Sequence, residues 1–232
     1  MKRIVITGAN GTIGRVLRKG LSRCEITALD LPKDDIKDYE KLLEKFHGHH
    51  VIVHLAWDTK TESYISGKSN PDNKIMFQNV YRAALETRVS RVVMASSVHI
   101  HDFYKWNGPG LITTEIKPIP NTPYGESKAL MENLGRDYGK QGLEVICIRF
   151  GGVKEVDSPP VQSKNHKTWL SHQDCVSLVE TCIEAPEIPN NFLIIHGVSN
   201  YPGRIHDYSN PLGCVPTDQN RKIYKPTFRE LF

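Results

Sequence analysis

The chain has 232 residues, of which 39% are apolar and 24% are charged, as is typical of a globular protein with one substantial core. The net charge of +4 is small and the basic residues are spread along the chain, so we expect no nucleic-acid partner. No stretch approaches the roughly 20 apolar residues of a membrane span, and the apolar run at residues 4–6 is too short for a signal-peptide core. We therefore expect a cytoplasmic protein without a membrane partner.

Neither the cysteines nor the histidines indicate a metal site. The five cysteines are scattered and form no C-x-x-C pair, and Cys175 and Cys182 share one face of a helical pattern, as buried thiols do. His47, His49 and His50 stand close together, but no acidic or cysteine partner lies at ligand spacing. A solvated turn explains these histidines better than a metal ion, and we expect none.

Short apolar runs alternate with amphipathic helical patterns along the chain. In chain order, the first half predicts a strand at 3–7, a helix at 14–22, a strand at 25–29, a helix at 36–46, a strand at 50–55 and a helix at 71–87. The second half predicts a strand at 91–96, a helix at 123–140, a strand at 143–150, a helix at 171–185 and a strand at 191–195. Ser171, with Asp174 three residues on, is the expected cap of the last helix.

Continuous apolar strands that alternate with helices predict an α/β fold, a doubly wound parallel sheet covered on both faces. Residues 151–170 and 197–232 break the alternation and are rich in Pro, Gly, Asn and His. We expect them to form a small C-terminal lobe that covers a substrate beyond the strand ends. The prediction is one domain, residues 1–232.

A glycine-rich loop joins the first strand to the first helix. Gly8 suits a tight turn, Gly11 permits close approach of the backbone to a pyrophosphate, and Gly14 allows the helix to pack against the strand. The helix N-terminus then offers unpaired N–H groups and a positive dipole to phosphates. The strand–loop–helix context favours a dinucleotide site of the Rossmann type over a merely structural turn.

Asp30, at the end of the second strand, indicates which dinucleotide binds. A carboxylate there accepts hydrogen bonds from the ribose hydroxyls and repels a 2′-phosphate, which favours NAD over NADP. Asp30 could instead cap the following turn, and Arg15 and Lys33 stand close enough in sequence to leave NADP open. Asp35, followed by Ile36, could meet the adenine amino group.

Three polar residues on successive strand–helix units predict the chemistry. Tyr124 and Lys128 lie one helical turn apart on one face, so the ammonium can stabilise a phenolate and lower the pKa of the tyrosine. Ser97 follows the fourth predicted strand and can hydrogen-bond the reacting oxygen. Each motif alone is common by chance, but together behind a glycine loop they predict acid–base catalysis of hydride transfer.

The sequence resembles the extended short-chain dehydrogenase/reductase (NAD-dependent epimerase/dehydratase) family over nearly its whole length. The matching stretches are TGANGTIG (7–14), HLAW (54–57), Asn73 with Asn79, RVVMASSVH (91–99) and PYGESK (123–128). Within the family it is most similar to uronate dehydrogenases, through SSVH (96–99), TWLSHQDCVSLVE (168–180) and SNPLGCVPTDQN (209–220). That resemblance implies oxidation of C1 of a hexuronic acid to the aldarolactone with NAD, and a homodimer or higher homo-oligomer.

The resemblance also implies residue roles. The catalytic residues are Ser97, Tyr124 and Lys128. The implied cofactor-binding residues are Gly8, Asn10, Gly11, Thr12, Ile13, Gly14, Asp30, Asp35, Ile36, Leu55, Ala56, Trp57, Asn73, Ala95, Tyr124 and Lys128. The implied substrate-binding residues are Thr59, Ser97, Val98, His99, Tyr124, Gly151 and Lys164.

The sequence departs from the uronate dehydrogenase pattern at the substrate residues. Val98 replaces an asparagine, and Lys164 replaces the arginine that binds the substrate carboxylate, so the charge stays but the bidentate fork is lost. His99 either binds substrate hydroxyls or packs within a loop, and Trp57 is expected to anchor a loop over the cofactor.

Two other functions fit the same fold. A nucleotide-sugar epimerase or dehydratase is disfavoured because the segments after residue 150 are short. A dinucleotide-sensing regulator has no need of an intact Ser/Tyr/Lys set.

Overall fold

The computed structural model describes residues 1–158 and 167–217. Six parallel strands form a sheet in the order β2-β1-β3-β4-β5-β6. The strands are β1 (Lys2–Thr7), β2 (Cys24–Leu29), β3 (Val51–His54), β4 (Arg91–Ser97), β5 (Glu144–Phe150) and β6 (Phe192–Gly197). This is the doubly wound Rossmann-type sheet that the alternating pattern predicted.

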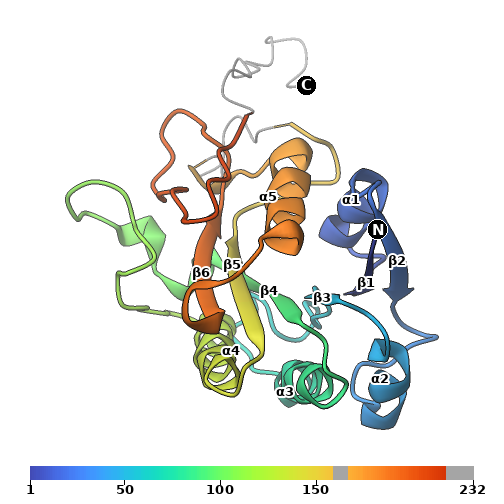
Figure 1. The fold of residues 1–232 in the computed structure, drawn as a ribbon. Coiled ribbons are helices and arrows are strands. Elements are labelled where there is room, and N and C mark those ends of the chain that lie inside the picture. Colours follow the sequence, from blue (N-terminus) through green and yellow to red (C-terminus); the bar gives the residue numbers. More distant parts are fainter. Residues whose placement is uncertain (159–166, 218–232) are drawn as a thin grey trace, which may run out of the picture.

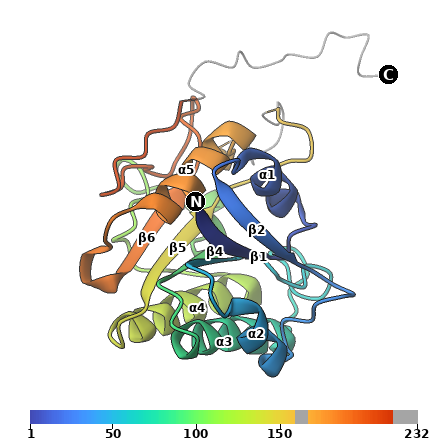
Figure 2. The same ribbon diagram turned by 45° about the vertical axis from the view of Figure 1, so that its right-hand side comes forward.

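Helices cover both faces of the sheet (Figures 1 and 2). The helices are α1 (Thr12–Gly20), α2 (Tyr39–Phe46), α3 (Pro71–Glu86), α4 (Pro123–Gly139) and α5 (His172–Glu184). In Figure 2, α1 and α5 lie above the sheet and α2, α3 and α4 lie below it. None of the described helices has the length and apolar composition that a membrane crossing requires.

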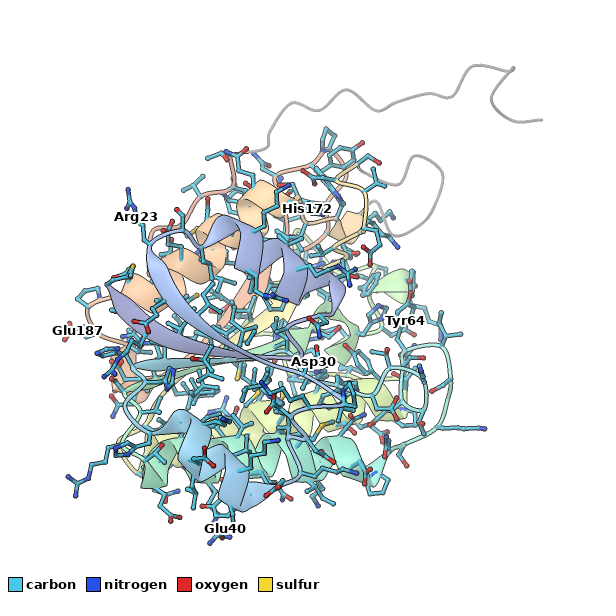
Figure 3. All side chains as sticks on the ribbon, turned by 90° about the vertical axis from the view of Figure 1, so that its right-hand side faces the viewer. Arg23, Asp30, Glu40, Tyr64, His172 and Glu187 are labelled. Atoms are coloured by element: carbon cyan, nitrogen blue, oxygen red, sulfur yellow. The ribbon has the colours of Figure 1, made fainter. Side chains whose placement is uncertain are left out.

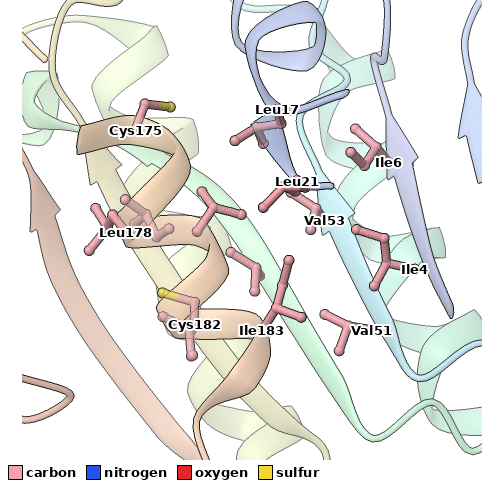
Figure 4. Packing of buried hydrophobic residues seen from close by; sticks show 14 of the residues in the cluster. Ile4, Ile6, Leu17, Leu21, Val51, Val53, Cys175, Leu178, Cys182 and Ile183 are labelled. Carbon is pink, nitrogen blue, oxygen red and sulfur yellow. The ribbon is translucent and has the colours of Figure 1, made fainter. Parts of the chain in front are cut away.

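Two apolar clusters fill the space between the sheet and its helices. On one face, Cys175 and Cys182 of α5 belong to the same buried cluster as Leu17 of α1 and the apolar side chains of β1 and β3 (Figure 4). On the other, Phe46 of α2 and Phe77 of α3 belong to a second fully buried cluster. Both cysteines are free thiols with no exposed surface, as the helical spacing predicted.

Side-chain caps decide where several helices begin. The carboxylate of Asp38 accepts a hydrogen bond from the N–H of Lys41 at 3.2 Å, so α2 starts at Tyr39 and not at the predicted residue 36. Ser171 caps α5 by accepting from the N–H of Asp174 at 3.1 Å, as predicted. The Thr122 hydroxyl caps α4 in the same way, which places Tyr124 in the first turn of that helix.

A small lobe of loops lies beyond the carboxyl ends of β4 and β6. It contains the 3-10 helices η1 (Val98–Ile100) and η2 (Phe103–Lys105), and its own apolar cluster joins Phe103 and Ile112 to Val198. An isolated bridge pairs Ile112 with His206. The described part of the C-terminal segment therefore packs on residues 98–112, a contribution that the sequence pattern did not indicate.

The chain leaves β1 for β2 on one side and then returns to β3 on the other. The carboxyl ends of β1 and β3 therefore form a topological switch point, where open parallel sheets bind ligands. The glycine loop follows β1 at this point.

Candidate active site

The glycine loop makes a cradle that side chains would fill. Gly8 has a φ of +66°, and a Cβ added there would lie 2.7 Å from the backbone nitrogen of Ala56. A Cβ on Gly14 would lie 2.6 Å from the carbonyl oxygens of Gly8 and Ala9. Gly11 caps α1 without a side-chain hydrogen bond, so the first N–H groups of the helix stay available to phosphates. These features fit a dinucleotide.

Asp30 lies beside this loop, at the end of β2, and Figure 3 labels it. Its carboxylate accepts hydrogen bonds from the N–H of Asn10 at 2.6 Å and from that of Leu31 at 2.8 Å. Asp30 therefore joins the glycine loop to the turn that follows β2. A carboxylate offers about four lone-pair sites, so capacity remains for the ribose hydroxyls as well.

The segment after β5 reaches back to the glycine loop. The carboxylate of Glu155 accepts from the hydroxyl of Thr12 at 2.7 Å and forms an ion pair with Arg15. Arg15 also donates to the carbonyl oxygen of Asn10. Arg15, one of the two cations that left NADP open in the sequence, is thus held by a carboxylate and a carbonyl group.

An open cleft of about 1000 Å³ runs from the glycine loop to Tyr124. Most of the predicted residues line it: Gly8, Gly11, Thr12, Ile13, Gly14, Asp30, Asp35, Ile36, Leu55, Ala56, Trp57, Thr59, Ala95, Ser97, Val98, His99, Tyr124, Lys128 and Gly151. Asn10 and Asn73 are not among the lining residues, and Lys164 falls outside the described residues. The backbone of Asn10 bonds Asp30 from the rim of the loop.

Ser97, Tyr124 and Lys128 meet at the end of the cleft that adjoins the lobe. Ser97 is the last residue of β4, and its hydroxyl accepts a hydrogen bond from the N–H of His99 at 3.1 Å. Burial raises the pKa of Tyr124 to about 12, the neighbouring Ser97 hydroxyl opposes that rise, and the negative charge of Glu62 adds to it. The phenol is therefore protonated in the free protein at neutral pH.

Lys128 is buried on the same face of α4. Its ammonium donates to the carbonyl oxygen of Ala95 at 2.8 Å and lies 3.4 Å from the centre of the Trp57 ring. Burial lowers the pKa of Lys128 to about 7, and the charge of Glu62 opposes this fall. Trp57 also stacks on Phe77 at 6.3 Å, so it anchors its loop over the lysine.

Asn73 is fully buried, and its side chain holds the loop before α3. Its Oδ1 accepts from the N–H of Asp58 at 2.7 Å, and its Nδ2 donates to Glu62 at 2.9 Å. The structure thus places this predicted cofactor residue behind the cleft wall. Glu62 itself lies in a polar loop with no periodic or motif signal, and the sequence interpretation did not find it.

His99 stands beside Tyr124 in an aromatic group. Its ring stacks on Tyr64 with centroids 4.1 Å apart and lies 5.0 Å from that of Phe103. Burial lowers the pKa of His99 to about 4, so the ring is neutral near pH 7. A neutral imidazole can hydrogen-bond sugar hydroxyls, but it adds no charge for a carboxylate. Tyr64, on the right of Figure 3, was not predicted.

Residues 4–153 match the NAD dependent epimerase/dehydratase family. L-arabinose 1-dehydrogenase (NAD(P)(+)) of Haloferax volcanii is 30% identical, over 96% of this chain and 99% of that protein. Uronate dehydrogenase of Agrobacterium fabrum is 34% identical, over 80% of this chain and 73% of that enzyme.

Solved structures also resemble this chain in fold. The crystal structure of uronate dehydrogenase from Agrobacterium tumefaciens superposes with a TM-score of 0.79 and 30% identity, covering 94% of this chain and 85% of that one. A mutant of that enzyme complexed with NAD gives a TM-score of 0.78 at 28% identity, with the same coverage. The family description and this complex both name NAD, the cofactor that the sequence predicted.

Proposed function

Because the chain belongs to the NAD dependent epimerase/dehydratase family and is an NAD-dependent dehydrogenase, we propose that its substrate is a hexuronic acid oxidised at C1 to the aldarolactone. The observation that carries the proposal is the joining of Ser97, Tyr124 and Lys128 at the end of a cleft whose other end is a phosphate cradle. The uronate dehydrogenases that match over most of the chain support the substrate.

The proposed reaction moves one proton and one hydride. Tyr124 first releases its phenol proton to solvent, and the phenolate then accepts the proton of the C1 hydroxyl while the C1–H bond breaks and C1 becomes the lactone carbonyl. NAD, when bound, would supply the hydride acceptor. Ser97 orients the reacting oxygen, and the charge of Lys128 stabilises the phenolate as the proton moves. Burial of the lysine strengthens this effect because little water screens it.

The residues that would hold cofactor and substrate follow from the cleft. Gly8, Gly11 and Gly14 would hold the pyrophosphate and Asp30 the ribose hydroxyls. At the substrate end we propose His99 and Thr59 for the sugar hydroxyls, beside Val98 and Gly151. Lys164 would pair with the substrate carboxylate.

A neutral aldose is the second candidate substrate. Val98 supplies no polar group and His99 is neutral, so the described wall near Tyr124 suits hydroxyls better than a carboxylate. The L-arabinose 1-dehydrogenase, which this chain matches over 99% of that protein's length, oxidises carbon 1 of its sugar according to its name.

One assay separates the candidates. Purified protein with NAD is given glucuronate, galacturonate, L-arabinose, glucose 6-phosphate and a UDP-sugar in separate reactions, and NADH fluorescence is followed. The proposal expects the highest kcat/KM with a hexuronate and an aldarolactone as the first product. Faster oxidation of L-arabinose than of both uronates would instead establish the neutral aldose.

A further inference from the structure

Glu62 is a fully buried carboxylate that no expected role explains. It has no exposed surface, and it accepts three hydrogen bonds. Ser127 Oγ donates to Oε1 at 2.5 Å, Asn73 Nδ2 donates to Oε2 at 2.9 Å, and the N–H of Asn70 donates to Oε2 at 3.3 Å. These partners come from α4, from α3 and from the residue that caps α3.

The partners of Glu62 suit the charged form of the carboxylate. The Asn73 amide and the Asn70 N–H can only donate to Oε2, and the Ser127 hydroxyl can donate to Oε1. The orientation of Asn73 is fixed independently, because its Oδ1 accepts from the N–H of Asp58 at 2.7 Å and its Nδ2 must therefore face Glu62. Within the described residues Glu62 forms no ion pair, so its charge is not cancelled by an adjacent cation.

The buried cation Lys128 directly follows Ser127, the partner of Glu62, in α4. The titratable groups that act on its charge come from the neighbouring elements: Glu62 of the loop before α3, Glu132 of α4, Cys147 of β5, Tyr124 of α4 and His54 of β3. Glu132 is already bound to Arg149, at 2.9 and 2.8 Å. Glu62, in contrast, has no cationic partner among the described residues, and its partner Ser127 adjoins Lys128 in the first turns of α4.

We propose that Glu62 is a positioning residue of the active site, whose buried charge keeps Lys128 an ammonium and whose bond to Ser127 fixes the first turn of α4. This role of Glu62 rests on the proposed function in one respect, that Lys128 takes part in the reaction. Without the carboxylate, a lysine held against Trp57 and Ala95 would lose its proton more easily. A neutral lysine no longer stabilises the Tyr124 phenolate.

The test follows the Lys128 proton directly in cofactor-free protein. Lysine labelled with 13C at Cε is titrated by NMR, and the Lys128 signal is assigned by its loss in Lys128→Arg. We expect Glu62→Gln to lower the proton affinity of Lys128 about tenfold. Glu62→Asp keeps the charge and should retain most of that affinity. Glu126→Gln removes an exposed carboxylate of the same helical turn and is the matched control.

An unchanged Lys128 titration in folded Glu62→Gln would overturn the proposal. If that variant does not fold, 13C-labelled glutamate in the wild-type protein decides, because a protonated Glu62 at pH 7 contradicts the role. Since neither measurement needs a substrate, failure to oxidise uronates would count against the proposed function and leave this inference standing.

Discussion

The cofactor half of the cleft (residues 8–15, 30–36 and 55–57) is built mainly from backbone, whereas the substrate half (residues 58–60, 64, 97–99, 124 and 151) is built mainly from side chains. In the cofactor half, the space for phosphates exists because glycines leave it empty and a helix begins there. In the substrate half, aromatic stacking around His99 and the buried bonds of Glu62 define the wall.

This difference has a physical consequence. A cradle made of backbone binds the pyrophosphate of any dinucleotide, so proteins with different substrates can share it. A wall of side chains changes with each substitution, so the substrate can differ between relatives of the same fold. The matched relatives fit this contrast, since their names give three different sugar substrates: L-arabinose, glucose 6-phosphate and a uronate.

Tyr124→Phe should give the largest effect and tests whether the two halves act separately. Loss of the hydroxyl removes the proton acceptor, and kcat should fall about 1000-fold. The affinity for NAD, measured by calorimetry, should change less than about threefold because the cradle is untouched. Loss of NAD affinity together with activity would show that the halves are not independent.

Gly8→Ala should damage the cofactor half. The added methyl group would lie 2.7 Å from the backbone nitrogen of Ala56, at a positive φ, so the loop must shift. We expect NAD affinity to fall at least about tenfold, with about 2 kcal/mol of stability lost. Gly67→Ala is the control, since Gly67 also has a positive φ, +63°, but nothing lies within 4 Å. Equal effects of both substitutions would refute the cradle.

Acid should weaken the lobe that borders the substrate half. Burial lowers the pKa of His196 to about 4 and that of His206 to about 2. As the pH falls below 6.5, the ordinary pKa of histidine, both side chains bind protons in the unfolded chain but stay neutral in the folded protein. Stability is therefore full above pH 6.5 and is lost as pH falls. From pH 6.5 to 5 each histidine should cost about 2 kcal/mol in urea unfolding.

His206→Gln should reduce that loss, because one buried group no longer takes up a proton on unfolding. His47→Gln, at an exposed position, is the control and should leave the pH dependence as in the wild type. A pH dependence equal in all three proteins would remove His206 from the explanation.

Asp30→Ser should have the smallest effect and tests which dinucleotide the cofactor half prefers. Loss of the carboxylate removes the repulsion of a 2′-phosphate and the charged bonds to Asn10 and Leu31. The ratio of kcat/KM for NADP to that for NAD should rise about tenfold, equivalent to about 1.4 kcal/mol. An unaltered ratio would mean that Asp30 serves the turn alone.

Sequence alone determined the features that depend on residues close to one another along the chain. Apolar periodicity located the six strands and five α-helices of the described residues, and the glycine loop and the Tyr124–Lys128 pair follow from spacing within one turn or one helix. Ser97 was found because strand ends of a parallel sheet share one edge. The helix starting at Tyr39 was misplaced because a single capping side chain set its boundary.

Tertiary structure decided the contacts between distant residues. Glu62 and Ser127 are 65 positions apart, and Arg15 and Glu155 are 140 apart. No periodicity records such pairs, because each side chain is ordinary in its own segment and gains its role only when the fold removes water from around it. The residues proposed for proton transfer could therefore be predicted from their spacing along the chain, whereas the charge proposed to sustain Lys128 could be found only in the folded protein.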